Sequence, residues 1–145
     1  MNIQLMPVDK DNWEECCGLS VTEGQEDFVV NNSFSILQSV YGENLYPMCI
    51  YNDDGIVGFL MYDIDPETKR WELSRFMIDG KHQGNGYGRQ ALVVLIEMLK
   101  KELGPINFYT SVEPKNKIMK KLIESVGFSA TGEIMWGEEV YCRLL

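Results

Sequence analysis

A glycine-rich stretch between residues 75 and 89 places the strongest constraint on what this chain can fold into. The apolar segment Phe76-Met-Ile78 ends in a polar turn, and Gln83-Gly-Asn-Gly86-Tyr-Gly88 follows. Residues 90–103 then carry apolar side chains at helical spacing. A strand that leads through glycines into a helix can bind phosphate, because glycine leaves backbone N–H groups accessible and a helix start has unpaired donors and a favourable dipole.

Two other kinds of phosphate loop are not predicted. A P-loop ends in Gly-Lys followed by Ser or Thr, whereas Gly88 is followed by Arg89. A nicotinamide-binding loop follows the first strand of a parallel series, whereas three strands of antiparallel pattern precede this loop. A tight turn with close helix packing is the remaining alternative for the glycines.

The rest of the pattern predicts a single α/β domain over residues 1–145 with a mixed, mostly antiparallel sheet of about seven strands and about four helices. The strand after the long helix should lie parallel to the strand before it. Strands are expected at residues 3–8, 46–51, 56–62, 71–78, 106–112, 128–135 and 139–144. Helices are expected at residues 12–19, 34–41, 90–103 and 116–126.

Details of three helices can also be predicted. Trp13, Cys16 and Cys17 are candidates for the buried side of the first helix, and Ser33 is a plausible N-cap for the second. The last helix is expected to turn Ile118, Leu122 and Val126 inward.

The formal net charge is −9. Such a charge repels nucleic acid and anionic membranes, so neither is expected as a partner. It favours a cationic small molecule or a basic peptide, with solubility alone as the alternative explanation. No apolar run approaches the ~20 residues of a membrane span, and the first residues lack the pattern of a secretory signal. We therefore expect a cytoplasmic protein.

Cysteine usage does not predict a metal site. Cys16, Cys17, Cys49 and Cys142 form no C-x-x-C pair, and His82 is the single histidine. The thiols are expected to be reduced and wholly or partly buried. His82 precedes the glycine loop and is expected to be a solvated neighbour of it.

Two separated motifs resemble the GCN5-related N-acetyltransferase (GNAT) superfamily. Gln83-Gly-Asn-Gly86-Tyr-Gly88 fits the pattern Q/R-x-x-G-x-G/A, and Asn116 precedes a helix that ends in Gly127-Phe128. The order of elements fits along nearly the whole chain. Further details resemble the small bacterial spermine/spermidine acetyltransferase-like members: Gln25 with Phe28, Ile56-Val-Gly58-Phe59, and Arg75-Phe-Met-Ile-Asp79.

The resemblance implies acetyl-CoA as cosubstrate and no metal. Asn116 would reach the cofactor near its thioester, and the strand of residues 106–112 would splay from its parallel neighbour to leave a slot for the pantetheine arm. That arm would lie along the backbone of Phe76, Met77 and Ile78. The loop that would bind the pyrophosphate consists of Gln83, Gly84, Asn85, Gly86, Tyr87, Gly88 and Arg89.

Acetyl transfer to an amine needs an oxyanion donor, and a proton donor for the thiolate assists it. The backbone N–H of Ile78, or of its neighbour, is our candidate for polarising the thioester carbonyl. The family often places a tyrosine where this chain has Ile123, which cannot donate a proton. Tyr109 and Tyr141 are other candidates, although neither has support from position.

The amine must also lose a proton before it attacks. Polyamine-type relatives tend to carry a carboxylate at the positions of Ser74 or Arg75, and the nearest acid here is Glu72 on the same strand. Glu72 is our candidate base, acting through water. The alternative is a solvated carboxylate paired with Arg70 or Lys69.

Acceptor binding is predicted at an acidic connection. Glu23, Glu26 and Asp27 would attract a cationic amine, and an exposed acidic loop is the alternative. The resulting hypothesis is an N-acetyltransferase that moves an acetyl group from acetyl-CoA to a primary amine, such as a polyamine, by direct attack in a ternary complex. A GNAT-fold module that binds CoA without catalysis is the rival, and the resemblance is compatible with a homodimer.

Overall fold

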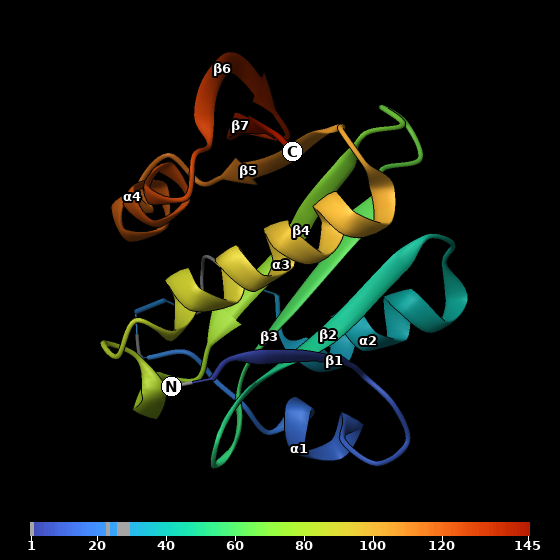
Figure 1. The fold of residues 1–145 in the computed structure, drawn as a ribbon, viewed down its shortest axis with the longest axis vertical. Helices are drawn as coiled ribbons and strands as arrows, with labels where there is room; N and C mark the ends of the chain where they lie inside the picture. The colour runs from blue at the N-terminus through green and yellow to red at the C-terminus, as the bar shows by residue number, and fades with distance from the viewer. Residues whose placement is uncertain (1, 23, 26–29) are drawn as a thin grey trace.

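The structure is a computed structural model that describes residues 2–22, 24–25 and 30–145. One seven-stranded sheet organises the chain, in the spatial order β1-β2-β3-β4-β5-β7-β6 (Figure 1). The strands are β1 (Gln4–Pro7), β2 (Leu45–Asn52), β3 (Gly55–Ile64), β4 (Trp71–Ile78), β5 (Asn107–Val112), β6 (Ser129–Met135) and β7 (Glu138–Leu144). The helices are α1 (Trp13–Cys17), α2 (Asn32–Tyr41), α3 (Tyr87–Leu103) and α4 (Lys117–Ser125), with the short 3-10 helix η2 (Gly80–His82) after β4.

The sheet is antiparallel except between β4 and β5, which run parallel on either side of α3 in the sequence. The predicted meander of β2, β3 and β4 is therefore confirmed, as is the mixed α/β fold class. The turn between β2 and β3 depends on Asn52, whose side-chain oxygen accepts from the backbone N–H of Asp54 at 2.8 Å and of Gly55 at 3.1 Å.

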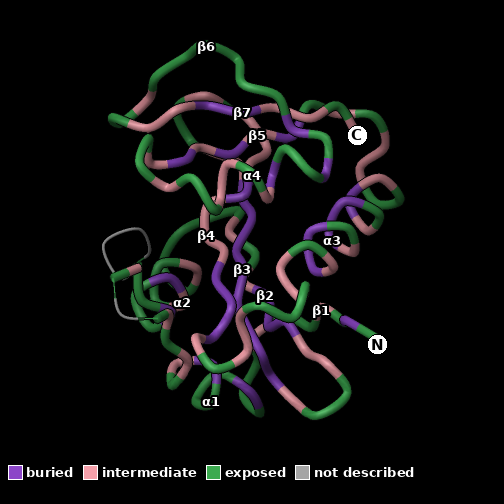
Figure 2. The backbone as a smooth tube through the Cα atoms, turned by 90° about the vertical axis from the view of Figure 1, so that its left-hand side faces the viewer, coloured by how far each residue is buried: buried purple, intermediate pink, exposed green. Residues whose placement is uncertain are grey.

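Helices cover both faces of the sheet. The long helix α3 lies on one face, where Leu92, Leu95 and Leu99 are buried, while α1 and α2 lie on the other face (Figures 1 and 2). The second face has its own apolar cluster, in which Phe59 and Met77 are buried. Because β3 lies between these two layers, it is buried along almost its whole length (Figure 2).

The parallel pair β4 and β5 separates soon after it forms. Three residue pairs join the two strands, and the last joins Leu73 to Thr110. The Thr110 hydroxyl, itself buried, donates to the carbonyl oxygen of Leu73 at 2.9 Å. Beyond this point no described strand lies beside this edge of β4, so the predicted splay is confirmed.

Some local predictions are wrong. The first helix is shorter than expected, and its Trp13 is 47% exposed. The N-cap of α2 is Asn31 and not Ser33, because the Asn31 side-chain oxygen accepts from the backbone N–H of Phe34 at 2.9 Å. Ile118 is 71% exposed. The inward side of α4 starts one residue later and comprises Met119, Leu122, Ile123 and Val126, which follow the i, i+3, i+4, i+7 pattern.

The separation of β4 from β5 yields a stability prediction. Replacement Thr110→Val removes the hydroxyl that donates to Leu73 and leaves a buried carbonyl without that donor. We expect a loss of about 1–3 kcal/mol in the free energy of unfolding, measured by urea denaturation. Thr110→Ser keeps the hydroxyl and should lose less. A Thr110→Val protein as stable as the parent would show that this bond does not hold the strands together.

Candidate active site

The glycine loop turns the chain from β4 into α3 through two left-handed residues. Gly84 has a φ of 82° and Gly86, the N-cap of α3, has a φ of 78°. A Cβ atom on Gly84 would meet nothing within 4 Å, so backbone conformation rather than crowding calls for glycine there. The helix begins at Tyr87, three residues earlier than predicted, and its first turn therefore follows the loop directly.

The backbone N–H groups of this loop are available to a ligand. Within the described chain, no protein group accepts a hydrogen bond from the N–H groups of residues 84–89. The first turn of α3 contains no acidic residue and has the exposed side chain of Arg89. A cation at the positive end of a helix is unfavourable by itself, so this end of the helix is suited to an anion.

Side chains hold the loop in shape without filling it. Gln83 Nε2 donates to the carbonyl oxygen of Ile78 and to the side-chain oxygen of Gln25, both at 2.9 Å. Asn85 turns back to donate to the carbonyl oxygen of His82 at 3.0 Å. The hydroxyl of Tyr87 accepts from Asn52 at 3.2 Å. The loop is therefore tied to the end of β4 and to the turn between β2 and β3.

The free edge of β4 leads away from this loop. The backbone N–H of Asp79 donates to the carbonyl oxygen of Val57 on β3 at 2.8 Å. Backbone N–H groups point to alternate sides along a strand. The N–H of Met77 therefore points toward β3, as that of Asp79 does, whereas the N–H groups of Phe76 and Ile78 point to the side from which β5 has separated. Among the described residues, no strand pairs with Phe76 or Ile78 on this side, so their backbone donors are open to the slot.

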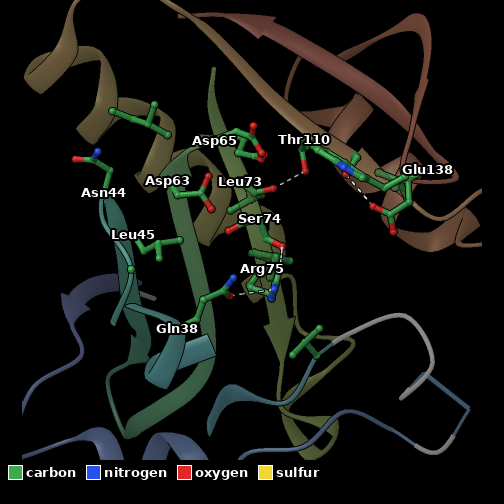
Figure 3. Close-up of a pocket in the computed structure, with 18 of the residues that line it drawn as sticks. Gln38, Asn44, Leu45, Asp63, Asp65, Leu73, Ser74, Arg75, Thr110 and Glu138 are labelled. Atoms are coloured by element: carbon green, nitrogen blue, oxygen red, sulfur yellow. Dashed lines mark hydrogen bonds between the residues drawn. The ribbon is translucent and has the colours of Figure 1, made fainter. Parts of the chain in front are cut away.

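A large cavity opens where β4 and β5 separate. Its volume is about 710 Å³, and Phe76, Met77 and Asn116 are among its lining residues, whereas the glycine loop lies outside it. Lys69 and Arg75 are the basic residues of the described lining. Figure 3 shows Asp63 and Asp65 on the β3 side of the cavity and Glu138 on the opposite side. The six acidic residues of the lining are Glu43, Asp63, Asp65, Glu72, Glu113 and Glu138.

Glu72 and Asp63 form the electrostatic centre of this cavity. They are direct partners across the β3–β4 ladder. Burial, followed by the negative charges of Asp63 and Asp65, raises the pKa of Glu72 to about 7, although Arg75 and Arg70 oppose the shift. Burial likewise raises the pKa of Asp63. Glu72 can therefore hold a proton near neutral pH, and the charge of Asp63 contributes to this.

The structure does not show the alternative in which Glu72 pairs with Arg70 or Lys69. Arg70 instead binds Glu133 through both terminal nitrogens, at 3.2 and 3.3 Å, and lies over the ring of Tyr109 at 4.2 Å. Among the described residues, neither Arg70 nor Lys69 forms an ion pair with Glu72.

The candidates around α4 have structural roles. Asn116 is the N-cap of α4, and its side-chain oxygen accepts from the backbone N–H of Met119 at 3.2 Å. This bond does not use the side-chain nitrogen, which is a donor. Ile123 is fully buried. Tyr141 is also buried, and no tyrosine belongs to the described lining of the large cavity, although Tyr109 borders a small cavity beside it.

The predicted acceptor residues Glu23, Glu26 and Asp27 lie outside the described residues. Val30, which follows that connection, lines the cavity. His82 packs beside the ring of Tyr87, with ring centres 6.4 Å apart. Among the described residues, no group of three or more His, Cys, Asp or Glu side chains could hold a metal ion.

Sequence reasoning missed most of the acidic lining. Asp63 was not singled out, although it directly follows a predicted strand and Glu72 lies near the start of the next. Antiparallel pairing across that connection would have placed the two carboxylates opposite each other. Glu138 was also missed, because it enters the cavity from the distant β6–β7 hairpin.

Comparison with known proteins identifies the class. The model of the acetyltransferase (GNAT) family matches residues 10–128. This match spans most of the chain, so the chain belongs to the GNAT family of acetyltransferases. No described helix is long and apolar enough to cross a membrane.

The chain is also similar to individual acetyltransferases. A spermine/spermidine N(1)-acetyltransferase from Bacillus subtilis is 28% identical, and the match covers all of both chains. Spermidine N-acetyltransferase from Vibrio cholerae, solved in complex with CoA and spermine, has a TM-score of 0.75 at 14% identity, over 99% of this chain and 94% of that one. An N-acetyltransferase from Thermoplasma acidophilum in complex with coenzyme A has a TM-score of 0.72 at 13% identity, over the full length of both.

The pKa of Glu72 predicts how stability depends on pH. Below about pH 4.5 the carboxyl group is protonated in both the folded and the unfolded chain. Between about pH 4.5 and pH 7 the unfolded chain has lost the proton while the folded chain still holds it, so stability falls across this range and levels off above pH 7. Glu72→Gln should therefore gain stability relative to the parent as the pH rises from about 4.5 to about 7, measured by urea denaturation. The exposed control Glu124→Gln should not, and an equal response of both variants would contradict the shifted pKa.

Proposed function

We propose that this protein transfers the acetyl group of acetyl-CoA to a primary amine of a small polycation such as a polyamine. Attack would be direct, with both substrates bound. The observation that carries the proposal is the free edge of β4. It runs from the N–H groups of residues 84–89, which have no partner in the described chain, to a cavity whose described lining contains six acidic residues. One end suits an anionic cofactor and the other suits a cationic acceptor.

The chain has the groups that the cofactor needs. The N–H groups of residues 84–89 and the side chain of Arg89 would bind the pyrophosphate. The unpaired N–H groups of Phe76 and Ile78 would bind the pantetheine amides as an added strand would. The side-chain nitrogen of Asn116, which the helix cap leaves free, would donate near the thioester.

The reaction then needs a base. An ammonium ion cannot attack, and a carboxylate whose pKa is about 7 can accept its proton near neutral pH. Glu72 would take that proton through water, and the negative charge of Asp63 helps to keep the proton affinity of Glu72 high. The neutral nitrogen forms its bond to the carbonyl carbon, and the N–H of Ile78 would stabilise the charge that develops on the oxygen.

Collapse of the intermediate breaks the carbon–sulfur bond and releases the thiolate of CoA, while the cationic nitrogen loses a second proton to water and becomes the neutral amide. Ile123 cannot protonate this group, and the described lining of the cavity holds no tyrosine. A thiol has an ordinary pKa of about 8.5, so a thiolate leaves without prior protonation far more readily than an alkoxide. We therefore propose that water, rather than a side chain, returns the proton to sulfur.

The choice of a polycation rests on charge and on the relatives. The acidic residues of the described lining outnumber the basic ones, Lys69 and Arg75. The similar protein from Bacillus subtilis is named a spermine/spermidine acetyltransferase. A further contribution to the negative charge around the acceptor remains predicted for Glu23, Glu26 and Asp27.

The rival proposal is a module that binds CoA without catalysis. The buried Ile123 is the observation in its favour, because the family often has a proton donor there. Release of free CoA from acetyl-CoA in the presence of spermine, spermidine and monoamines separates the two proposals. Tight binding of CoA without turnover of any amine would favour the module.

Placement of CoA can be tested at the loop. Gly86→Glu puts a carboxylate where the phosphate would lie, and we expect CoA affinity to fall about 100-fold or more, which corresponds to about 2.7 kcal/mol. Isothermal titration calorimetry measures this change. Gly104→Glu is the matched control, since Gly104 ends the same helix with a φ of 72° and has open space around it. Equal losses in both variants would mean that the loop is not the phosphate site.

The role of Glu72 can be tested by the pH dependence of kcat/KM. The proposal requires an ionised carboxylate, so the rate should rise as the pH passes through about 7. Glu72→Gln should lower the rate about 100-fold or more and remove this limb of the profile. Asp63→Asn removes a negative neighbour and should shift the limb to lower pH. A Glu72→Gln profile that keeps the parent's limb would exclude Glu72 as the base.

A further inference from the structure

The turn between β6 and β7 contains a residue that does not suit its backbone. Met135 pairs with Glu138, so Trp136 and Gly137 form a two-residue hairpin turn. Their φ angles are 53° and 78°. A turn with positive φ at both positions strongly favours Asn-Gly, and a bulky side chain in this region is strained. Local structure therefore does not explain the tryptophan.

Packing does not explain Trp136 either. Its side chain is 60% exposed and belongs to neither apolar cluster of the structure. It lines the acidic cavity, and it also lines the small cavity beside Tyr109. A large aromatic residue thus borders a cavity of negative charge at the expense of favourable turn geometry.

The hairpin is held in place against the rest of the sheet. Arg70, the residue before β4, binds Glu133 of β6 and lies over the ring of Tyr109 of β5. On the β7 side, the hydroxyl of Ser111 donates to the carboxylate of Glu138 at 2.8 Å. These contacts on both sides of the turn fix the wall of the cavity to which Trp136 belongs.

We propose that Trp136 selects the acceptor: its indole ring receives a cationic nitrogen of the amine that is remote from the reacting one. An ammonium group over an indole face is attracted by the ring quadrupole, and tryptophan is the best aromatic residue for this contact. Glu138 and Glu113 of the same lining add negative charge. A monoamine has no second cation and gains nothing from this wall. The inference rests on the proposed function and identifies the residue that distinguishes a polyamine from a monoamine.

The experiment compares spermidine with butylamine as acceptors for the parent, Trp136→Asn and Trp136→Phe. Asparagine suits the left-handed turn, so Trp136→Asn should fold at least as stably as the parent in urea. Its KM for spermidine should rise about five- to tenfold, while its KM for butylamine changes less than about twofold. Trp136→Phe keeps a ring face and should lose less. Trp13→Asn, at an exposed tryptophan that does not line the cavity, should leave both constants unchanged.

Other outcomes separate this inference from the proposed function. An unchanged KM for spermidine in Trp136→Asn, or equal increases for both amines, would overturn the role of Trp136. If the parent acetylates no amine, the proposed function fails. Calorimetric titration of spermidine into the parent and Trp136→Asn then still decides the inference, because equal affinities would overturn it and weaker binding by the variant would support it.

Discussion

The divergence of β4 from β5 is the constraint on which the rest of the structure depends. The strands run together for three residue pairs, and the Thr110 hydroxyl caps the last pair by donating to Leu73. The next residue, Ser74, lies at an irregularity of the β3–β4 ladder, where Met61 pairs with Arg75 and Tyr62 with Leu73. A bulge at this point bends the strand as it loses its parallel neighbour. The unpaired backbone donors and the cavity both follow from this arrangement.

Charge gives the two ends of the free edge different chemistry. At one end, N–H groups and Arg89 gather at a helix start that carries no acidic residue in its first turn. At the other end, carboxylates from β3, β4 and the β6–β7 hairpin face the same cavity. Burying like charges together costs stability, and the raised pKa values of Glu72 and Asp63 express that cost. A cationic acceptor would offset it, which links the electrostatics of the fold to its proposed substrate.

Much of the fold could be predicted from the sequence because its signals are local. The glycines of the loop and the apolar spacing of α3 each specify structure over a few residues, and the strand positions needed only the alternation of apolar side chains. The errors of detail arose where a neighbouring residue could fill the same role. Asn31, and not Ser33, is the N-cap of α2, and the buried side of α4 begins after Ile118.

The active site was harder to predict because its acidic wall is assembled from distant segments. Glu72 could be identified from its own strand. Prediction of Asp63 requires the register between two strands, and prediction of Glu138 requires the position of a remote hairpin. The tryptophan at position 136 gave no signal until its backbone angle and its exposure were known together. Residues that contribute a side chain to the site were therefore harder to predict than residues that contribute their backbone.

The central claim is that CoA binds along the free edge of β4, with its pyrophosphate at the N–H groups of the glycine loop. Titration of CoA into isotopically labelled protein, followed through backbone amide chemical shifts, tests it most directly. We expect the largest shifts at residues 84–89, with further shifts at Phe76 and Ile78. Saturating CoA that leaves these amides unmoved while it shifts amides on another surface would show that CoA does not bind here.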